Sequence, residues 1–141
     1  MQLLNFTIGG QNIDLEWSNG GYADLHNDYK FHLLTYSPTE TKLTLCWQKS
    51  LDDWAKEVTI ERLELVFEKV DFLRIKERDP AYPVSEDSCL QVICRTPQQA
   101  RNEFENIYFN EDTQNNYDLT FFFQSEWGLK VHAEMVYLRY I

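Results

Sequence analysis

Glycine and proline are scarce in this chain, with 5 glycines and 4 prolines among 141 residues. So few residues of these types argue against linker-type sequence, and 43% hydrophobic residues argue against intrinsic disorder. No run approaches the roughly 18 apolar residues of a membrane-spanning helix. The length is typical of one domain, and the irregular stretches 77–88 and 110–116 are too short and unbiased for linkers. We therefore predict a single β domain over residues 1–141.

Basic residues are outnumbered, because 13 lysines and arginines face 23 aspartates and glutamates, for a net charge of -10. The excess of acids is equal before and after Val70, so the charge belongs to the whole surface rather than to a tail. An acidic surface repels phosphate backbones and anionic lipids, so we predict binding to neither nucleic acid nor membranes. It permits a basic protein partner, although solubility alone would also explain the charge.

Cysteines are few and odd in number, and Cys46, Cys89 and Cys94 lack the spacing of a metal site or disulfide framework. The N-terminal residues, MQLLNFTI, lack the basic start, long apolar run and cleavage site of a signal peptide. Together these observations predict a reducing, cytoplasmic location.

Residue types that bind metals are sparse. Asp24, His26 and Asp28 alternate, so an extended chain would present all three on one side toward a hard or borderline cation. A zinc ion would need further ligands that the neighbouring sequence does not supply, and a polar turn between strands explains the same residues. We therefore predict no metal and no cofactor.

Signatures of nucleophilic catalysis are also missing. The sequence has no Gly-x-Ser-x-Gly turn and no glycine-rich phosphate loop. Cys46 has the surroundings of a packing residue in mid-strand, and Cys89 and Cys94 would face opposite sides of one strand. The acid pairs at 52–53 and 86–87 diverge in a strand, unlike the paired carboxylates of a glycosidase cleft. We predict a protein without enzymatic activity.

Aromatic residues are plentiful, at 15%, and they follow the period-two alternation that is typical of β-strands. The inward positions predicted from this pattern are Leu43, Leu45, Trp47, Leu119, Phe121 and Phe123. Near the end, the alternation changes phase between 129–135 and 136–140, which predicts a bulge or a strand that passes between sheets. Further candidate strands cover 3–8, 30–36, 57–76 and 89–95.

Turn residues separate these strands. The glycine-containing cluster at 9–12 predicts a hairpin that closes on Ile13 and Leu15, and the cluster at 37–40 predicts a turn that joins two antiparallel strands. The predicted fold is mainly β, either an antiparallel two-sheet sandwich or a partly open barrel, with one short helix.

The helix is predicted over residues 97–108. Thr96-Pro97-Gln98-Gln99 has the form of a capping box with proline at the first helical position, and Ala100, Phe104 and Ile107 recur with helical spacing. A strand over 103–109 is the alternative, because aromatic and β-branched residues cluster there.

Lysine and arginine are absent between Asn102 and Leu129, where six acids alternate with aromatic residues. Acidic side chains beside tyrosine and tryptophan are typical of an interface that captures a basic protein, although a solvated loop beside a core strand has a similar composition. The predicted partner-binding residues are Glu103, Glu105, Glu111, Asp112, Tyr117, Asp118, Glu126 and Trp127.

Sugar binding is another use for exposed aromatic rings on a β scaffold. Trp17, Tyr22, Tyr29 and Trp127 could present flat faces for stacking, although most aromatics in a β domain of this size fill its core. A carbohydrate- or small-ligand-binding β-sandwich module is therefore the alternative function.

Several segments carry a resemblance to known proteins. The runs DLHND, FHLLTY, LTLCW, LTFFF and LKVHAE resemble those of small bacterial β-sandwich proteins, some of which are similar to immunity proteins of polymorphic toxin systems. The resemblance brings no catalytic residue and implies a protein that binds another protein. The leading hypothesis is a non-catalytic binding protein that uses an acidic, aromatic-containing surface against a basic partner, with an immunity-like inhibitor as its sharpest form.

Overall fold

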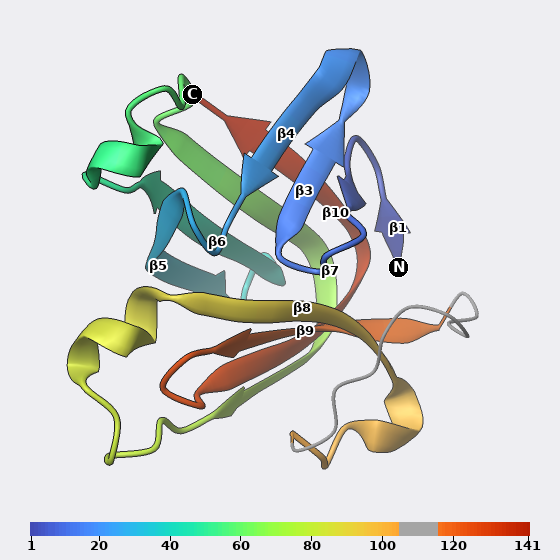
Figure 1. Ribbon diagram of the computed structural model, residues 1–141. Coiled ribbons are helices and arrows are strands. Elements are labelled where there is room, and N and C mark those ends of the chain that lie inside the picture. Colours follow the sequence, from blue (N-terminus) through green and yellow to red (C-terminus); the bar gives the residue numbers. More distant parts are fainter. Residues whose placement is uncertain (105–115) are drawn as a thin grey trace.

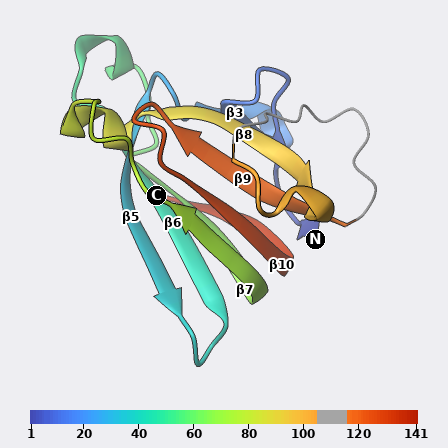
Figure 2. The ribbon, with the colours of Figure 1, turned by 90° about the horizontal axis from the view of Figure 1, so that it is seen from below.

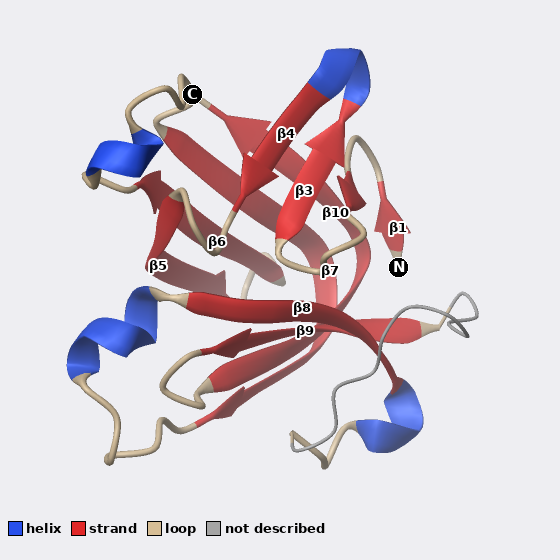
Figure 3. Ribbon diagram, in the orientation of Figure 1, coloured by secondary structure: helices blue, strands red, loops and turns tan. Residues whose placement is uncertain are grey.

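The computed structural model describes residues 1–104 and 116–141, and strands dominate them (Figures 1 and 3). The strands are β1 (Gln2–Leu3), β2 (Thr7–Ile8), β3 (Asp14–Trp17), β4 (Gly21–Asp24), β5 (Tyr29–Ser37), β6 (Lys42–Lys49), β7 (Arg62–Lys76), β8 (Leu90–Pro97), β9 (Tyr117–Phe123) and β10 (Gly128–Tyr140). Short 3₁₀ turns join some of them: η1 (Ser18–Gly20), η2 (Asp53–Ala55), η3 (Val84–Ser88) and η4 (Gln98–Ala100).

The strands form one large curled sheet and one small sheet (Figures 1 and 2). The large sheet has the order β5-β6-β7-β10-β9-β8 with antiparallel neighbours, and β1 joins β10 as a parallel neighbour. The small antiparallel sheet has the order β2-β3-β4. The prediction of a mainly β fold is confirmed, and its form is a curled antiparallel sheet with a second, small sheet.

The large sheet has two halves that share its longest strands. In one half, the first part of β7 pairs with β6 on one side and with the last part of β10 on the other. In the other half, the first part of β10 pairs with the last part of β7 on one side and with β9 on the other. Between the halves, Lys69 has a φ of 57°, and the register shifts between His132 and Ala133. The phase change predicted between 129–135 and 136–140 therefore lies near, but not at, the irregularity at which the strands pass from one half to the other.

Side chains hold this turn on both strands. Asp71 is the extra residue of β7, because His132 pairs with Phe72 and Ala133 with Val70. The Asp71 carboxylate lies 2.6 Å from Nδ1 of His132, and Lys69 pairs with Glu134 at 2.9 Å. The irregularity is thus tied down by polar contacts between β7 and β10.

The core lies inside the curl and beneath the small sheet. All six predicted inward positions are fully buried: Leu43, Leu45, Trp47, Leu119, Phe121 and Phe123. Leu15 and Ala23 of the small sheet belong to the same hydrophobic cluster, so both sheets bury one interior. The predicted hairpin is also present, because Ile8 pairs with Leu15, and the predicted turn at 37–40 joins β5 to β6.

The predicted short helix is not confirmed. Pro97 is the last residue of β8, and η4 is a single turn of 3₁₀ helix. The Thr96 hydroxyl, which would cap the helix, instead bonds to the Thr120 hydroxyl at 2.8 Å on the neighbouring strand. Glu103 and Phe104 are not in a strand either, and the rest of both predicted segments lies outside the described residues. None of the described helical elements is long and apolar enough to cross a membrane.

Candidate functional site

The predicted partner-binding residues do not form one patch. Glu105, Glu111 and Asp112 lie outside the described residues. Two others, Tyr117 and Asp118, begin β9, and Glu126 and Trp127 follow the opposite end of that strand. The acidic aromatic segment therefore divides into separate environments, which we describe in turn.

At the start of β9, Asp118 is fully buried. Its two carboxylate oxygens accept hydrogen bonds from Nε and Nη2 of Arg101, at 2.8 and 2.9 Å, and this bonding raises the pKa of Arg101. The Tyr117 ring is also buried, with the Arg95 guanidinium 5.4 Å from its centroid. Burial leaves neither side chain available to a partner in this structure.

Glu103 is exposed and lies in residues 98–104, a segment that side chains of the sheet hold in place. The Lys130 ammonium donates to the carbonyl of Ala100 at 2.5 Å, and Arg74 donates to the carbonyl of Arg101 at 2.7 Å. Lys130 is buried, and burial lowers its pKa. Lys130 and Arg74 therefore serve to hold residues 98–104 against the sheet.

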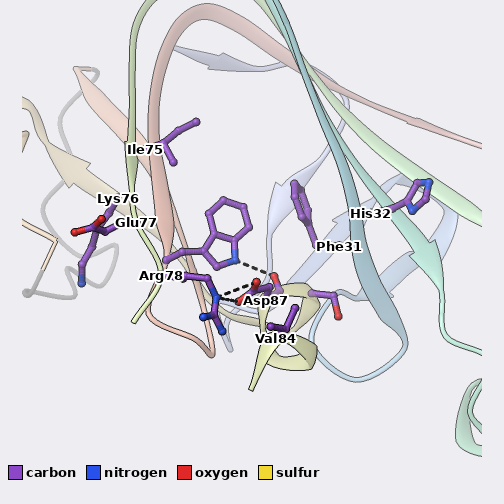
Figure 4. Close-up of a pocket in the computed structure, with 10 residues that line it drawn as sticks. Phe31, His32, Ile75, Lys76, Glu77, Arg78, Val84 and Asp87 are labelled. Atoms are coloured by element: carbon purple, nitrogen blue, oxygen red, sulfur yellow. Dashed lines mark hydrogen bonds and ion pairs between the residues drawn. The ribbon is translucent and has the colours of Figure 1, made fainter. Parts of the chain in front are cut away.

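At the other end of β9, side chains from four parts of the chain line a groove of about 450 Å³, which we call the Trp127 groove (Figure 4). They come from β5, from the end of β7 and the residues after it, from η3, and from the turn between β9 and β10. The lining residues are Phe31, His32, Ile75, Lys76, Glu77, Arg78, Val84, Asp87, Ser88 and Trp127.

Trp127 is held in place by three contacts. Its ring stacks on Phe123 with centroids 4.1 Å apart and planes 4° apart, and Phe31 lies 5.5 Å away at a tilt. Its indole N–H donates to the carbonyl of Asp87 at 2.8 Å. Before it in the turn, Glu126 has a φ of 68°, so the backbone reverses within a few residues. The indole is therefore fixed before any ligand arrives.

The loop after β7 is held to η3 by an ion pair. Nε of Arg78 donates to both carboxylate oxygens of Asp87, at 2.9 and 3.1 Å, and Nη2 donates to the carbonyl of Tyr82 at 2.8 Å. Figure 4 shows this pair beside the groove. Because Arg78 and Asp87 neutralise each other, the pair gives the groove a firm wall with little net charge.

The remaining lining combines apolar side chains with the base Lys76 and the acid Glu77, and two more glutamates are sequence neighbours of lining residues. Ile75 and Val84 keep 54% and 74% of their surface exposed, although both are aliphatic. Glu77 lies in the lining, Glu86 lies in η3, and Glu126 is next to Trp127 and accepts a hydrogen bond from Tyr82. None of these three glutamates takes part in an ion pair within the described residues.

The polar residues considered above for metal binding or nucleophilic catalysis make hydrogen bonds within the fold. Asp24 accepts hydrogen bonds from the backbone of His26 and Asn27, as in a polar turn. Nδ1 of His26 lies 2.5 Å from the Leu90 carbonyl, so that nitrogen carries the proton and cannot take one from the Cys89 thiol 3.7 Å away. No group of three potential metal-ligating side chains occurs in the part of the chain that the structure describes.

The four rings considered for sugar stacking do not share a surface. Trp17, Tyr22 and Trp127 line three different cavities, and Tyr29 is buried beside Tyr22. Only Tyr22 among them has half its surface exposed, at 52%. These rings therefore do not form a common stacking platform.

The sequence analysis predicts one lining residue of the groove, Trp127, and its neighbour Glu126, but misses the rest of the groove. Phe31 was counted only as a strand residue, and the stretch 77–88 only as an irregular loop. The available signal was the pair of prolines at 80 and 83 beside charged residues, which marks an ordered loop rather than a flexible one. No protein-family model, curated protein or solved structure matches this chain.

Proposed function

We propose that this chain is a non-catalytic binding protein that captures a basic protein partner at the Trp127 groove, and that an immunity-like inhibitor is the most specific form of this function. The observation that carries the proposal is an apolar groove that internal contacts prearrange, in a strongly acidic chain, with Glu77 in its lining and Glu86 and Glu126 next to lining residues in the sequence. None of these three glutamates forms an ion pair among the described residues.

The groove has the parts of an interface anchor site. Phe31 and Trp127 are fixed by ring contacts, so binding does not have to order them. Ile75 and Val84 expose aliphatic surface beside these rings, which is costly in a free protein and favourable when a partner covers it. An apolar or aromatic side chain of the partner would fill the groove as the desolvated centre of the interface.

The acids in and near the groove supply the preference for a basic partner. Glu77 lines the groove next to Lys76, whereas Glu86 and Glu126 are sequence neighbours of lining residues, and the chain as a whole carries a net charge of -10. Such a field accelerates the approach of a basic protein and slows that of an acidic one. The effect is screened by salt, with a Debye length of about 10 Å at 0.1 M.

The test is capture of partners from host lysate, followed by binding kinetics with each purified partner. The rim variant is Glu86→Lys with Glu126→Lys, and the matched control is Asp53→Lys with Glu57→Lys, which changes the net charge equally on the loop before β7. We expect association with a basic partner to slow about tenfold in the rim variant and much less in the control.

A second variant tests the apolar surface. Ile75→Ser with Val84→Ser removes exposed aliphatic groups, so the fold should be kept while dissociation becomes faster. The proposal fails if the captured partners are acidic, if both charge variants behave alike, or if the serine variant binds as the unmodified chain does.

A further inference from the structure

The two edges of the large sheet differ in how they are covered. The β8 edge is partly covered by the turn between β2 and β3, because the N–H of Ile93 donates to the carbonyl of Asn12 at 2.7 Å, and β8 ends in Pro97. The β5 edge has β6 as its one neighbour in the sheet. Among the described residues, no backbone hydrogen bond outside the β5–β6 ladder involves residues 30–37.

Only the first part of β5 carries the usual protection of an edge strand. Lys30 and the register shift between Phe31 and Leu33 discourage another strand from pairing there. Residues 33–37, with the sequence LLTYS, have no charge, no proline and no further irregularity. Leu33 and Tyr36 are 48% and 39% exposed, so this stretch is an open edge with apolar side chains.

The open edge continues into the Trp127 groove. Phe31 and His32 line the groove, and they immediately precede residues 33–37 on β5 (Figure 4). Figure 2 shows β5 at the border of the sheet, with η3 near its first residues. A strand that paired with the open edge would therefore lead directly toward the groove.

Charge around the edge selects the kind of strand. Asp28 precedes β5, Glu40 follows it, and Glu86 lies in η3, which packs against β5; the nearby bases are Lys30 in β5 and Lys42, the partner of Ser37. Antiparallel pairing of two copies would bring the start of one β5 beside the end of the other, so Lys30 as well as Asp28 would lie near Glu40 of the second copy. The repulsion that remains is between two chains that each carry a net charge of -10. A basic segment from another protein avoids this repulsion and is attracted by the same carboxylates.

We propose that the basic partner binds as an extended segment that adds a strand to the open edge of β5 at residues 33–37 and places its leading side chain in the Trp127 groove. This inference rests on the proposed function, because it describes how the same groove holds the same class of partner. Backbone pairing supplies affinity here, while the groove and the carboxylates select the sequence.

The test begins with a display library of random ten-residue peptides selected on the folded full-length chain. We expect selected peptides to combine β-forming residues with lysine or arginine. Hydrogen exchange with the best peptide should then show slower exchange at those amides of residues 33–37 that point away from β6, since alternate amides of an edge strand are unpaired. Methylating alternate backbone nitrogens of the peptide on the β5-facing side should abolish binding, whereas methylating the other set should not.

A pair of variants tests the same point from the side of the protein. Thr35 and Thr44 face each other across β5 and β6, so Thr35→Lys changes the edge strand and Thr44→Lys changes its inner neighbour at the same level. We expect Thr35→Lys to weaken peptide binding about tenfold and Thr44→Lys to leave it nearly unchanged.

The outcomes separate the two proposals. Failure to select basic peptides would overturn the proposed function and this inference together. Basic peptides that protect the Trp127 groove but leave the amides of residues 33–37 unchanged would overturn strand addition alone. A dimer in sedimentation at low micromolar concentration, with residues 33–37 protected without peptide, would show that a second copy occupies the edge and would also overturn the inference.

Discussion

The two ends of β9 have similar residue types and opposite environments. At the start of the strand, Asp118 is buried in a double hydrogen bond with Arg101, and Tyr117 is buried beside it. After its end, Glu126 is exposed and Trp127 borders an open groove. The difference is whether the fold supplies a cation. A paired acid joins the interior, whereas an acid without a pair, next to a fixed ring, stays available for recognition.

The largest effect on stability is expected at the end of β9, where Phe123 lies between the core and the Trp127 groove. Phe123 is fully buried and carries the stacked Trp127 ring, so Phe123→Ala should lower the free energy of unfolding by about 3–5 kcal/mol. Urea denaturation gives this value, and tryptophan fluorescence should report a more mobile indole. Phe123→Leu is the control and should cost less, because it leaves a smaller cavity. A loss below about 1 kcal/mol for alanine would show that Phe123 does not support the groove.

The next largest effect is expected at the start of β9, where Asp118 is paired with Arg101. Asp118→Asn removes the charge that pairs with Arg101 and leaves buried polar groups poorly matched, so unfolding should become easier by about 2–3 kcal/mol. Glu134→Gln is the control, because its ion pair with Lys69 is exposed and should contribute less than about 1 kcal/mol. Equal losses in the two variants, measured by thermal and urea denaturation, would refute the contrast.

A smaller effect on stability is expected when the pH is raised, and it comes from Lys130. Burial lowers the pKa of Lys130 despite the nearby charge of Asp118, so the folded chain binds this proton less tightly than the unfolded chain does. The free energy of unfolding should therefore rise with pH in the range between the lowered pKa and the usual value of 10.5. Lys130→Met lacks this gain, so the stability of the unmodified chain relative to this variant should increase from neutral pH toward pH 10.5. A flat or falling difference would contradict the burial of a charged ammonium.

The smallest change in stability is expected at the rim of the groove. Glu126→Gln removes an exposed carboxylate whose one described hydrogen bond is a 3.4 Å contact from Tyr82, so the free energy of unfolding should change by less than about 0.5 kcal/mol. Association with a basic partner should nevertheless slow, and more so at low salt. Slower association at low salt without loss of stability is the signature of a recognition residue. A destabilised variant would instead show that Glu126, like Asp118, stabilises the fold.

Alternation of residue types was sufficient to predict the core. Leu45 and Phe121 are assigned to the interior by the alternation of residue types alone, and both are fully buried. The phase change near the end of the chain indicated an irregularity in that strand. It did not indicate that β7 is the strand that pairs with it there. These are local properties, and the sequence carries them within a few residues.

The helix and the site depended on contacts that are distant in the sequence. Thr96 bonds to Thr120 rather than capping a helix, and Asp118 is buried because Arg101 reaches it from the turn after β8. The Trp127 groove combines Phe31 with residues more than forty positions later. No local pattern encodes such meetings, so composition could indicate an acidic aromatic surface but not which of its residues would remain exposed.

The central position of β10 has a consequence for how the chain folds. This strand lies between β7 and β9 and also pairs with β1. In that pairing Gln2 of β1 lies opposite Met135 of β10, so the paired residues are separated by most of the sequence. During synthesis, the two halves of the sheet cannot join until residues 128–140 leave the ribosome. Until then β7 has an unsatisfied side, and its apolar residues are open to chaperones and to aggregation. With so many pairings of high sequence separation, folding should be slow for a domain of this size.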